Sequence, residues 1–382
     1  MQPFVCGTFI NKCLIVSRFG KTGITINKEM YRKILELSKT DSKITPLISD
    51  LLDKMGTKID FNHNLNDVIL VKEPTSFSFG RVSYDITEIC NYRCKHCYLG
   101  RKTKSNLSVL DKKNIIKLIG ECGCLWLQIT GGEPLLDRDF VEVYSSAHSL
   151  GLLITLSTNG SLLTESRIAN TLKSHPPYRI TVSMYGATAT SYEALTQTKG
   201  SFQQFINSLH WSKEAAIRTR LNIIITKYNQ NEMNDMINLA EKLGFEYYVF
   251  SNISPTINGN AHPLELMARD CEKIEEQGAF IPKKDRYAPC EAGQTSFHVN
   301  SRGEASICKT ARKPAVNLLR EGTNAFNKLS QISNQIMNQR SLCTHCETRE
   351  SCNTCPLILK LYLQGKVVPS FVCSKYYSKG GD

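Results

Sequence analysis

The sequence has no apolar stretch long enough to cross a bilayer. Its longest apolar runs, such as DVILV and PLILKLYL, fall far short of the roughly 20 residues that a transmembrane helix needs. The opening segment MQPFVCGTFINKCLIV lacks the basic start, continuous apolar stretch and small-residue cleavage site of a secretory signal. We therefore expect a cytoplasmic protein that does not enter a membrane.

The sequence also lacks internal repeats, low-complexity segments and dense basic runs. Its 382 residues, of which 41% are hydrophobic and 21% charged, have the composition of a globular protein with two or three domains. The net charge is +12, but the lysines and arginines are spread along the chain. An acidic peptide and a nucleic acid are both compatible with this charge, which favours neither strongly.

Cysteine, by contrast, is abundant. Structural disulfides are rare in a reducing compartment, so 15 cysteines there indicate metal ligands or catalytic groups. They gather in two regions, 90–97 and 290–373. Five others stand apart, and we interpret them as small buried hydrophobic residues. These are Cys6, Cys13, Cys122, Cys124 and Cys271.

Residues 1–75 have the pattern of a small separate domain. CLIVSRFGKTGITIN predicts a hairpin, and KEMYRKILELSK and TPLISDLLDKMG predict two helices, the second ending at a glycine. Strands followed by two short helices resemble a winged helix-turn-helix. The GKT at 20–22 is not a phosphate-binding loop, because Ile15 stands where the leading glycine should be.

Residues 80–252 show a different pattern, in which six short apolar strands alternate with amphipathic helices. This alternation predicts parallel strands with helices outside, as in a partial or full barrel, with the chemistry at the carboxyl ends of the strands. Residues 253–382 are loop-rich and cysteine-dense, with helices expected near 263–277 and 323–339. Such a region is typical of a fold held by metal rather than by a large core.

Two motifs follow the first two predicted strands of this barrel. CNYRCKHC places three soft ligands, Cys90, Cys94 and Cys97, close together without the fourth that a tetrahedral zinc site needs. TGGEPLL, at 130–136, has two glycines that allow close approach of backbone to a ligand, and Glu133 can accept hydrogen bonds from an ammonium group. LSTNG and SMYG end the next two strands, so four loops meet at one face.

These residues resemble those of the radical S-adenosylmethionine enzymes. The cysteine motif matches that superfamily's C-x3-C-x2-C, and GGEP matches its element for the methionine amino group. The resemblance implies that the three cysteines hold three irons of a 4Fe-4S cluster, whose fourth iron binds S-adenosylmethionine. One electron would then cleave this cofactor to a radical that removes a substrate hydrogen. The residues that the resemblance places at the cofactor are His96, Thr130, Gly131, Gly132, Glu133, Pro134, Asn159 and Ser183.

Simpler roles stay open for parts of this set. Asn159 could cap a turn, and Ser183 could be a plain hydroxyl at a strand end. The three cysteines taken alone could belong to a partial zinc site, although GGEP then has no explanation.

The carboxyl-terminal cysteines resemble the SPASM extension, which carries two auxiliary 4Fe-4S clusters. The resemblance assigns Cys290, Cys308 and Cys355 to the first cluster. It assigns Cys343, Cys346, Cys352 and Cys373 to the second. A zinc ribbon is the alternative, and its two C-x2-C pairs are usually about 12 to 20 residues apart. Only five residues separate the two pairs here, which favours iron–sulfur clusters over a single zinc ion.

Three features depart from the SPASM pattern. CNTC has two residues between its cysteines where the family has three, and the first auxiliary cluster has three obvious ligands, so Cys271 or an open iron would complete it. Sulfatase-maturing enzymes place an aspartate base directly after the second cysteine, whereas this chain has Lys309 there. A lysine is a poor base at neutral pH, which argues against sulfatase-type chemistry.

The whole pattern predicts an α/β fold: a partial (β/α)6 TIM-like radical barrel with a winged-helix-like amino-terminal domain and a SPASM domain. It resembles maturases of ribosomally made peptides, whose amino-terminal domain binds the leader as an added strand. We expect three clusters, S-adenosylmethionine, a precursor peptide and a flavodoxin- or ferredoxin-type electron donor. The radical would act at a peptide Cα or Cβ, and a thioether or carbon–carbon cross-link would follow.

Two alternatives remain open on the sequence alone. Peptide epimerisation needs a thiol hydrogen donor, and it gives the auxiliary clusters no electron to remove. A zinc-containing nucleic-acid-binding protein would use the winged helix and the positive charge, but the basic residues form no patch in the sequence.

Overall fold

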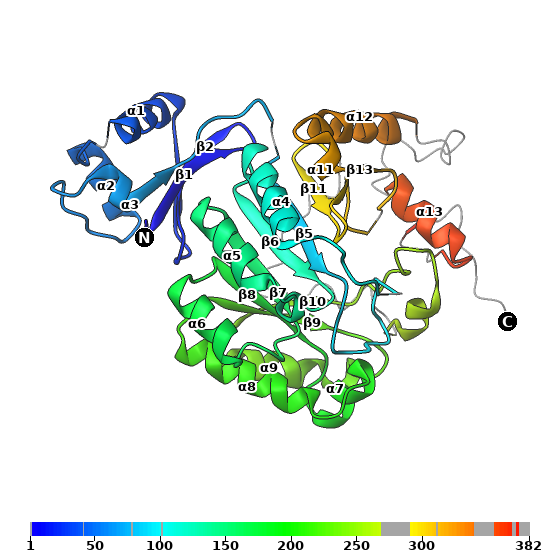
Figure 1. Ribbon diagram of the computed structural model, residues 1–382. Coiled ribbons are helices and arrows are strands. Elements are labelled where there is room, and N and C mark those ends of the chain that lie inside the picture. The colour runs from blue at the N-terminus through cyan, green and yellow to red at the C-terminus, as the bar shows by residue number, and fades with distance from the viewer. Residues whose placement is uncertain are drawn as a thin grey trace.

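The computed structural model describes most of the chain, whose arrangement Figure 1 shows. The described residues are 2–40, 42–77, 79–100, 102–268, 291–310, 312–339, 355–368 and 372–373. Within them, no helix combines the length and the apolar character that crossing a membrane would require.

The amino-terminal unit is a four-stranded sheet with helices packed on it. Its strands, in the order β3-β2-β1-β4, are β1 (Phe4–Phe9), β2 (Lys12–Ser17), β3 (Gly23–Ile26) and β4 (Ile69–Val71). Its helices are α1 (Lys28–Lys39), α2 (Pro46–Lys54) and the short α3 (Leu65–Val68). The antiparallel β2–β3 pair and the first two helices confirm the predicted hairpin and helices. The sequence pattern did not predict β1, α3 or β4.

Local sequence explains where the two main helices of this unit begin. Asn27 caps α1 by accepting a hydrogen bond from the Met30 amide. Thr45 caps α2, and Pro46 follows in the first helical position, where its missing amide hydrogen costs nothing. Their apolar faces, which include Ile34 and Ile48, close a core around the buried thiols of Cys6 and Cys13.

Six consecutive parallel strands form one side of a nine-stranded sheet, with β10 at its edge. They are β5 (Arg81–Thr87), β6 (Trp126–Gly131), β7 (Leu153–Thr158), β8 (Arg179–Met184), β9 (Thr219–Ile224) and β10 (Glu246–Phe250). Each strand pairs in parallel with the next along the chain, so the sheet order is β10-β9-β8-β7-β6-β5-β11-β12-β13. The six predicted strands are all present.

Helices connect these strands as the alternation predicts. They are α4 (Val109–Glu121), α5 (Phe140–Ser149), α6 (Ser166–Ser174), α7 (Ala189–Thr196), α8 (Ser201–Glu214) and α9 (Met233–Leu243), with short 3-10 turns at η1 (Pro134–Leu136) and η2 (Gln230–Glu232). A capping box between Ser108 and Asp111 starts α4. The core between helices and sheet includes the buried Cys122 and Cys124, as expected for these two cysteines.

The carboxyl-terminal region contributes strands that the sequence analysis did not predict. β11 (Ser296–Val299) lies parallel to β5, and β12 (Glu304–Ser306) and β13 (Ala315–Asn317) continue the sheet in antiparallel fashion. The helical segments of this region are η3 (His262–Leu266), α11 (Leu318–Glu321), α12 (Asn324–Gln339) and α13 (Pro356–Gln364). α12 confirms the helix expected at 323–339. Only residues up to 268 of the helix expected at 263–277 are described. Within them the structure has the short 3-10 helix η3, and the rest of this prediction lies outside the described residues.

The amino-terminal unit packs against the amino ends of the barrel strands. Val5 and Val16 form a buried cluster with Leu125 and Leu153, which lie at the starts of β6 and β7. In Figure 1 this unit, in blue, lies to one side of the barrel, and α12 and α13, in orange and red, lie on the other. The carboxyl ends of the six strands face away from this contact.

Candidate active site

A cavity of about 330 Å³ opens at the carboxyl ends of the barrel strands. Five of the six parallel strands, β6 to β10, contribute side chains to it. The strand residues in its lining are Gln128, Thr130, Gly131, Ser157, Thr158, Thr181, Ser183, Asn222, Ile224 and Phe250. A cavity is therefore present at the predicted position of the site, the carboxyl ends of the barrel strands.

The three cysteines of the first motif line this cavity together. They lie on the loop after β5, where the Cys97 amide donates a hydrogen bond of 3.2 Å to the Cys94 carbonyl and tightens the loop. The Cys90 sulfur accepts from the Tyr92 amide at 3.4 Å and from Asn159 Nδ2 at 3.8 Å. The structure thus brings Asn159, at the end of β7, to the first cysteine.

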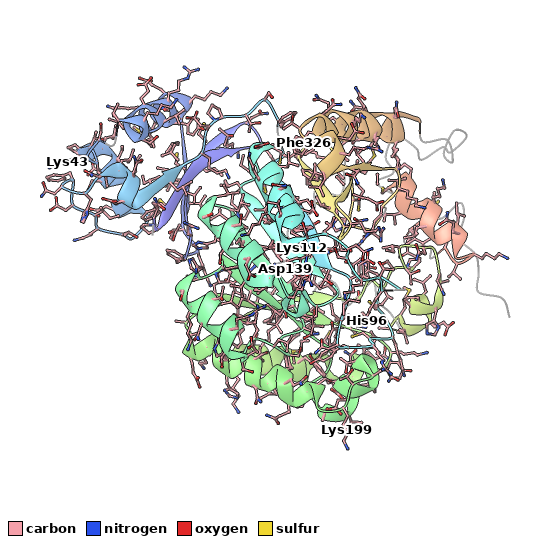
Figure 2. All side chains as sticks on the ribbon, in the orientation of Figure 1. Lys43, His96, Lys112, Asp139, Lys199 and Phe326 are labelled. Carbon is pink, nitrogen blue, oxygen red and sulfur yellow. The ribbon has the colours of Figure 1, made fainter. Side chains whose placement is uncertain are left out.

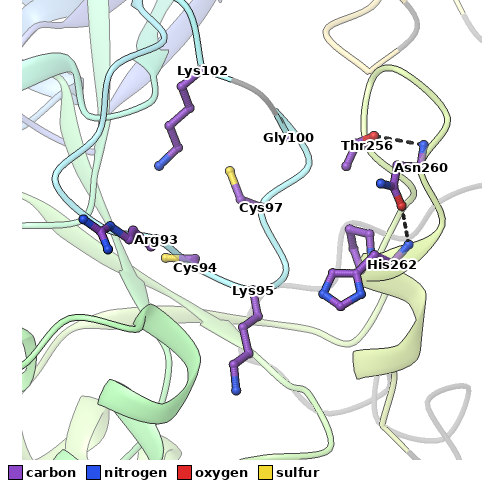
Figure 3. A pocket seen from close by; sticks show the side chains of 10 residues that line it. Arg93, Cys94, Lys95, Cys97, Gly100, Lys102, Thr256, Asn260 and His262 are labelled. Carbon is purple, nitrogen blue, oxygen red and sulfur yellow. Dashed lines mark hydrogen bonds between the residues drawn. The ribbon is translucent and has the colours of Figure 1, made fainter.

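A second cavity, of about 530 Å³, lies beside Cys94 and Cys97. Figure 3 shows their thiols together with the basic side chains of Arg93, Lys95 and Lys102. Lys102 Nζ donates a hydrogen bond of 2.5 Å to the carbonyl of Tyr92, which lies between Cys90 and Cys94, and this bond stabilises the cysteine loop. The two cysteines therefore have space next to them that a bulky group could fill.

Burial raises the pKa of the Cys94 thiol, and the nearby sulfur atoms of Cys97 and Cys90 raise it further. Burial also raises the pKa of Cys90. A metal ligand must be a thiolate, and a bound metal supplies the positive charge that stabilises it. The Cys90 and Cys94 thiols therefore lie where they would stay protonated until metal binds.

The TGGEP loop packs directly on the cysteine loop, which explains its glycines. The Gly132 amide donates to the Thr87 carbonyl and the Glu133 amide to the Ile89 carbonyl, both at 2.8 Å. A Cβ added at Gly132 would lie 2.3 Å from the Ile89 carbonyl oxygen, so only glycine fits. The close approach observed here is to the backbone before the first cysteine, and the predicted approach of these glycines to a ligand stays a prediction.

The Glu133 side chain joins two strand ends. Its carboxylate accepts from Thr158 Oγ1 at 2.7 Å, from the Asn159 amide at 2.7 Å and from the Leu135 amide at 3.1 Å. Burial raises the pKa of Glu133 to about 7, although these three hydrogen bonds act to lower it. The carboxylate thus fixes the loop after β7 beside the cysteine loop, and its backbone lies next to the cavity-lining Gly132.

The other predicted cofactor residues lie close to this loop. Thr130 and Ser183 line the cavity, and Pro134 is buried at the start of η1. Asn159 lines the cavity and also caps its turn, because its Oδ1 accepts from the Ser161 amide at 2.9 Å. Both roles considered for this asparagine are therefore compatible with its position.

Three buried polar atoms in the cavity wall have no partner within the described residues. They are His96 Nδ1, Thr181 Oγ1 and Asn222 Oδ1. Burial lowers the pKa of His96 to about 4, so its ring is neutral at pH 7, and it lies 5.0 Å from the Tyr185 ring. Buried polar atoms rarely stay unpaired, so this wall suits a polar ligand.

Sequence reasoning did not find Thr181 or Asn222. The available signal was the polar alternation inside two apolar strands, Arg-x-Thr-x-Ser in β8 and Arg-x-Asn in β9.

The carboxyl-terminal region reaches this cavity through Lys309, which is part of its lining. Its Nζ lies 5.9 Å from the centre of the Tyr98 ring. Arg312, three residues on, donates to Asp85 Oδ2 at 2.6 Å, and His298 Nε2 lies 3.5 Å from the same oxygen. Burial acts to raise the pKa of Asp85, but His298 and Arg312 bring it below its usual value.

The remaining predicted metal ligands are described only in part. Cys308 follows β12, Cys355 caps α13, and Cys373 packs against the small core beside α13. Cys290, Cys343, Cys346 and Cys352, and the spare Cys271, lie outside the described residues. Within the described part of the chain, no three His, Cys, Asp or Glu side chains are already drawn together as a metal site. The ligand sets of all three clusters stay predictions.

Comparison with known proteins shows what the barrel region is similar to. Residues 84–240 match the model described as the Radical SAM superfamily. The AdoMet-dependent heme synthase of Oleidesulfovibrio alaskensis is 28% identical over 198 residues, 51% of this chain and 50% of the synthase. The PqqA peptide cyclase of Rhizobium meliloti is 32% identical over 162 residues, 42% of this chain and 43% of the cyclase. The chain matches about half the length of such curated relatives.

A solved structure resembles the chain over more of its length. Streptococcus suis SuiB bound to precursor peptide SuiA superposes with a TM-score of 0.64, covering 93% of this chain and 94% of that one at 13% identity. This likeness confirms the fold, an α/β protein with a mostly parallel sheet.

Proposed function

We propose that this chain is a radical S-adenosylmethionine enzyme that matures a ribosomally made precursor peptide. The observation that carries the proposal is the meeting of the CNYRCKHC and TGGEP loops at one cavity. That cavity lies at the carboxyl ends of a barrel whose residues 84–240 match the superfamily. We propose a thioether or carbon–carbon cross-link as the product.

The residues of the cavity fit the groups that this chemistry needs. Cys90, Cys94 and Cys97 would hold a 4Fe-4S cluster, and the unpaired atoms of Thr181 and Asn222 would contact S-adenosylmethionine. When bound, the cluster and this cofactor would supply one-electron chemistry that removes a hydrogen from the substrate. Glu133 would keep the TGGEP backbone against the cysteine loop, so that its carbonyl groups face the cofactor.

The carboxyl-terminal region would complete the site on the substrate side. We propose that Cys308, Cys355 and Cys373 contribute to two auxiliary clusters, together with Cys290, Cys343, Cys346 and Cys352. These clusters would accept the second electron of a cross-link. Lys309 in the cavity wall would favour a negatively charged group and is a poor proton acceptor, so sulfatase-type chemistry is not proposed.

The amino-terminal unit supports a peptide substrate. Within the described residues, β3 pairs only with β2, so its other edge can receive an added strand. SuiB, which has the same fold, was solved with its precursor peptide. We propose that the leader of the precursor binds at this edge and that a flavodoxin- or ferredoxin-type protein supplies electrons.

A tetrapyrrole substrate is the second candidate, because AdoMet-dependent heme synthases are among the relatives. The two candidates predict different roles for β3. A Thr25→Pro variant removes a backbone amide from this strand and would weaken leader binding. The same change lies outside the barrel and would leave turnover of a tetrapyrrole unaltered.

Anaerobic reconstitution with iron and sulfide tests the proposal first. Three clusters predict about twelve irons per chain. Reduced enzyme should then cleave S-adenosylmethionine to 5′-deoxyadenosine, and a precursor peptide should lose one pair of hydrogens by mass spectrometry. Negligible iron with one or two tightly bound zinc ions would instead support the nucleic-acid-binding alternative.

The same assay in heavy water separates cross-linking from epimerisation. A cross-link lowers the peptide mass and leaves the other Cα–H positions unlabelled. Uptake of one solvent deuterium at a Cα without loss of hydrogens would show an epimerase and exclude the cross-link.

A further inference from the structure

Two arginines lie on the inner face of the barrel, below the candidate active site. Thr181 and Ser183 of β8, and Asn222 of β9, line the cavity. Alternate residues of a strand share a face, so Arg179 and Arg220 face the same interior, nearer the amino ends of β8 and β9. Ser183 lies four positions after Arg179, which is about 13 Å along a strand.

These guanidinium groups lack hydrogen-bond acceptors. Within the described residues, no acceptor contacts Arg179 or Arg220, and the Nε atom of each is buried. The neighbouring Arg218 also has buried and unpaired Nε and Nη1 atoms within the described part of the chain. Each guanidinium carries five N–H donors, and a buried donor without an acceptor is costly.

The carboxylate that could pair with them is already engaged. Glu246 lies beside Arg220 in the sheet register, but Lys21 Nζ lies 2.6 Å from its Oε1 and Arg218 Nη2 lies 3.4 Å from both oxygens. Positive charge therefore exceeds negative charge around the arginine pair. Burial and the charge of Arg179 lower the pKa of Arg220 to about 10, so it stays charged at neutral pH.

A buried hydroxyl group near Arg179 and Arg220, on the same inner face, also has no hydrogen-bond partner within the described residues. Thr181, only 3% exposed, is the neighbour of Arg220 across the β8–β9 pair and lies two residues above Arg179. Its Oγ1 makes no hydrogen bond within the described residues. Thr181 belongs to the wall of the active-site cavity, so the unpaired donors of Arg179 on β8 and Arg220 on β9 lie below that wall, nearer the amino ends of the strands.

We propose that Arg179 and Arg220 bind a small dianionic oxyanion of the phosphate class inside the barrel, apart from the candidate active site. Their Cα atoms lie about 8 Å apart by strand geometry, which lets two long side chains reach one ion. The planar N–H fork of arginine matches the oxygen spacing of phosphate. Two guanidinium groups balance two negative charges, which favours a dianion over a carboxylate.

Calorimetric titration of inorganic phosphate into the full chain, without iron or S-adenosylmethionine, tests this proposal. At low ionic strength and pH 7.5 we expect one site with submillimolar affinity. R179Q and R220Q should each weaken it at least tenfold, whereas R32Q, at an exposed arginine of α1, should not change it. Because no cofactor is present, the result is independent of the proposed enzyme activity.

Further arms of the experiment identify the ligand class. Sulfate should bind in the same range, and acetate at least tenfold more weakly. R179K and R220K keep the charge but lose the fork, so they should bind more weakly than wild type even if the glutamine variants do not fold. No heat with millimolar phosphate, equal affinity for acetate, or unaltered binding by all four variants would each overturn the proposal.

Discussion

The two ends of the barrel differ in the charge of their polar groups that lack hydrogen-bond partners within the described residues. At the carboxyl ends, loops with three cysteines and two glycines enclose a cavity whose unpaired atoms are neutral, on His96, Thr181 and Asn222. At the amino ends, the unpaired groups are cations, on Arg179 and Arg220, and the amino-terminal unit packs nearby. One sheet thus offers two different ligand environments on one inner face.

The difference follows from what each end does for the fold. At the amino ends, the amino-terminal unit packs on the starts of the strands through the apolar cluster that includes Val5 and Leu125. The carboxyl ends are tied by backbone contacts between loops, such as the bond from Gly132 to Thr87. Loops held in this way leave side chains free for ligands. The predictions below test this contrast.

The largest effect is expected from removing a cysteine at the carboxyl ends. C94S should lose about four of roughly twelve irons and reduce cleavage of S-adenosylmethionine to background. The matched control is C124S at the amino end of β6, where the Cys124 thiol donates to the Trp126 carbonyl at 3.2 Å and serine can do the same. Iron assay and 5′-deoxyadenosine formation give the readout. Equal iron loss in both variants would contradict the assignment.

The next effect concerns the buried ion pair that holds α4 to the TGGEP side of the barrel. Lys112, 3% exposed, lies 2.6 Å from Asp137 and 2.9 Å from Asp139 (Figure 2). K112M leaves the buried Asp137 carboxylate and the half-buried Asp139 carboxylate without their cation and should lower the free energy of unfolding by roughly 3–5 kcal/mol.

Chemical denaturation of K112M measures this loss. K117M provides the control, because Lys117 is exposed and lies 3.8 Å from Glu121 on the same helix. That exposed pair should contribute less than about 0.5 kcal/mol. A similar cost for both variants would show that burial does not set the strength of the first pair.

A pH-dependent effect is expected at Glu133. Its pKa in the folded chain is about 7 against an ordinary 4.5, so the folded state keeps a proton that the unfolded state releases. The associated stability is present below pH 4.5 and is lost as the pH rises through about 7. It amounts to about 3 kcal/mol.

E133Q, which is neutral at every pH, should lack this dependence. Unfolding free energies of wild type and E133Q, measured from pH 5 to pH 8, should therefore differ by an amount that changes with pH. Groups that titrate identically in both proteins cancel in this difference. A constant difference across the range would show that the Glu133 carboxylate is already ionised at pH 5.

The smallest effect belongs to Lys21 at the amino ends. Lys21 is exposed in its pair with the half-buried Glu246, so K21M should change the unfolding free energy by less than about 1 kcal/mol. Phosphate affinity should fall about two- to threefold, the effect of one charge on the order of 8 Å away in water. E246Q should change the affinity in the opposite direction, and calorimetry distinguishes the two. The same sign for both variants would exclude an electrostatic origin.

The sequence was sufficient to predict the parallel strands and the position of the site. Apolar strands of five to seven residues, such as β5 and β8, are readable because both faces are covered and propensity agrees with burial. The CNYRCKHC and TGGEP motifs could be placed because each directly follows such a strand. The cavity in contact with both motifs confirms that placement.

The missed elements are short and depend on distant partners. β11 to β13 have three or four residues each, and β11 exists because its backbone pairs with β5, more than 200 residues earlier. No local pattern encodes such a partner. The role of the Glu133 side chain was also beyond local patterns, since it depends on where the end of β7 lies.

The position of the amino-terminal unit sets a length scale for any substrate held by both ends of the molecule. Lys21, in the loop before β3, contacts the first residue of β10, whereas the cavity opens at the carboxyl ends of the strands. A strand such as β5, with seven residues, spans about 20 Å. A peptide anchored at β3 would need at least about six extended residues before its first reactive position. The distance between β3 and the cavity would then keep the residues nearest the leader out of the cavity, and these residues would stay unmodified.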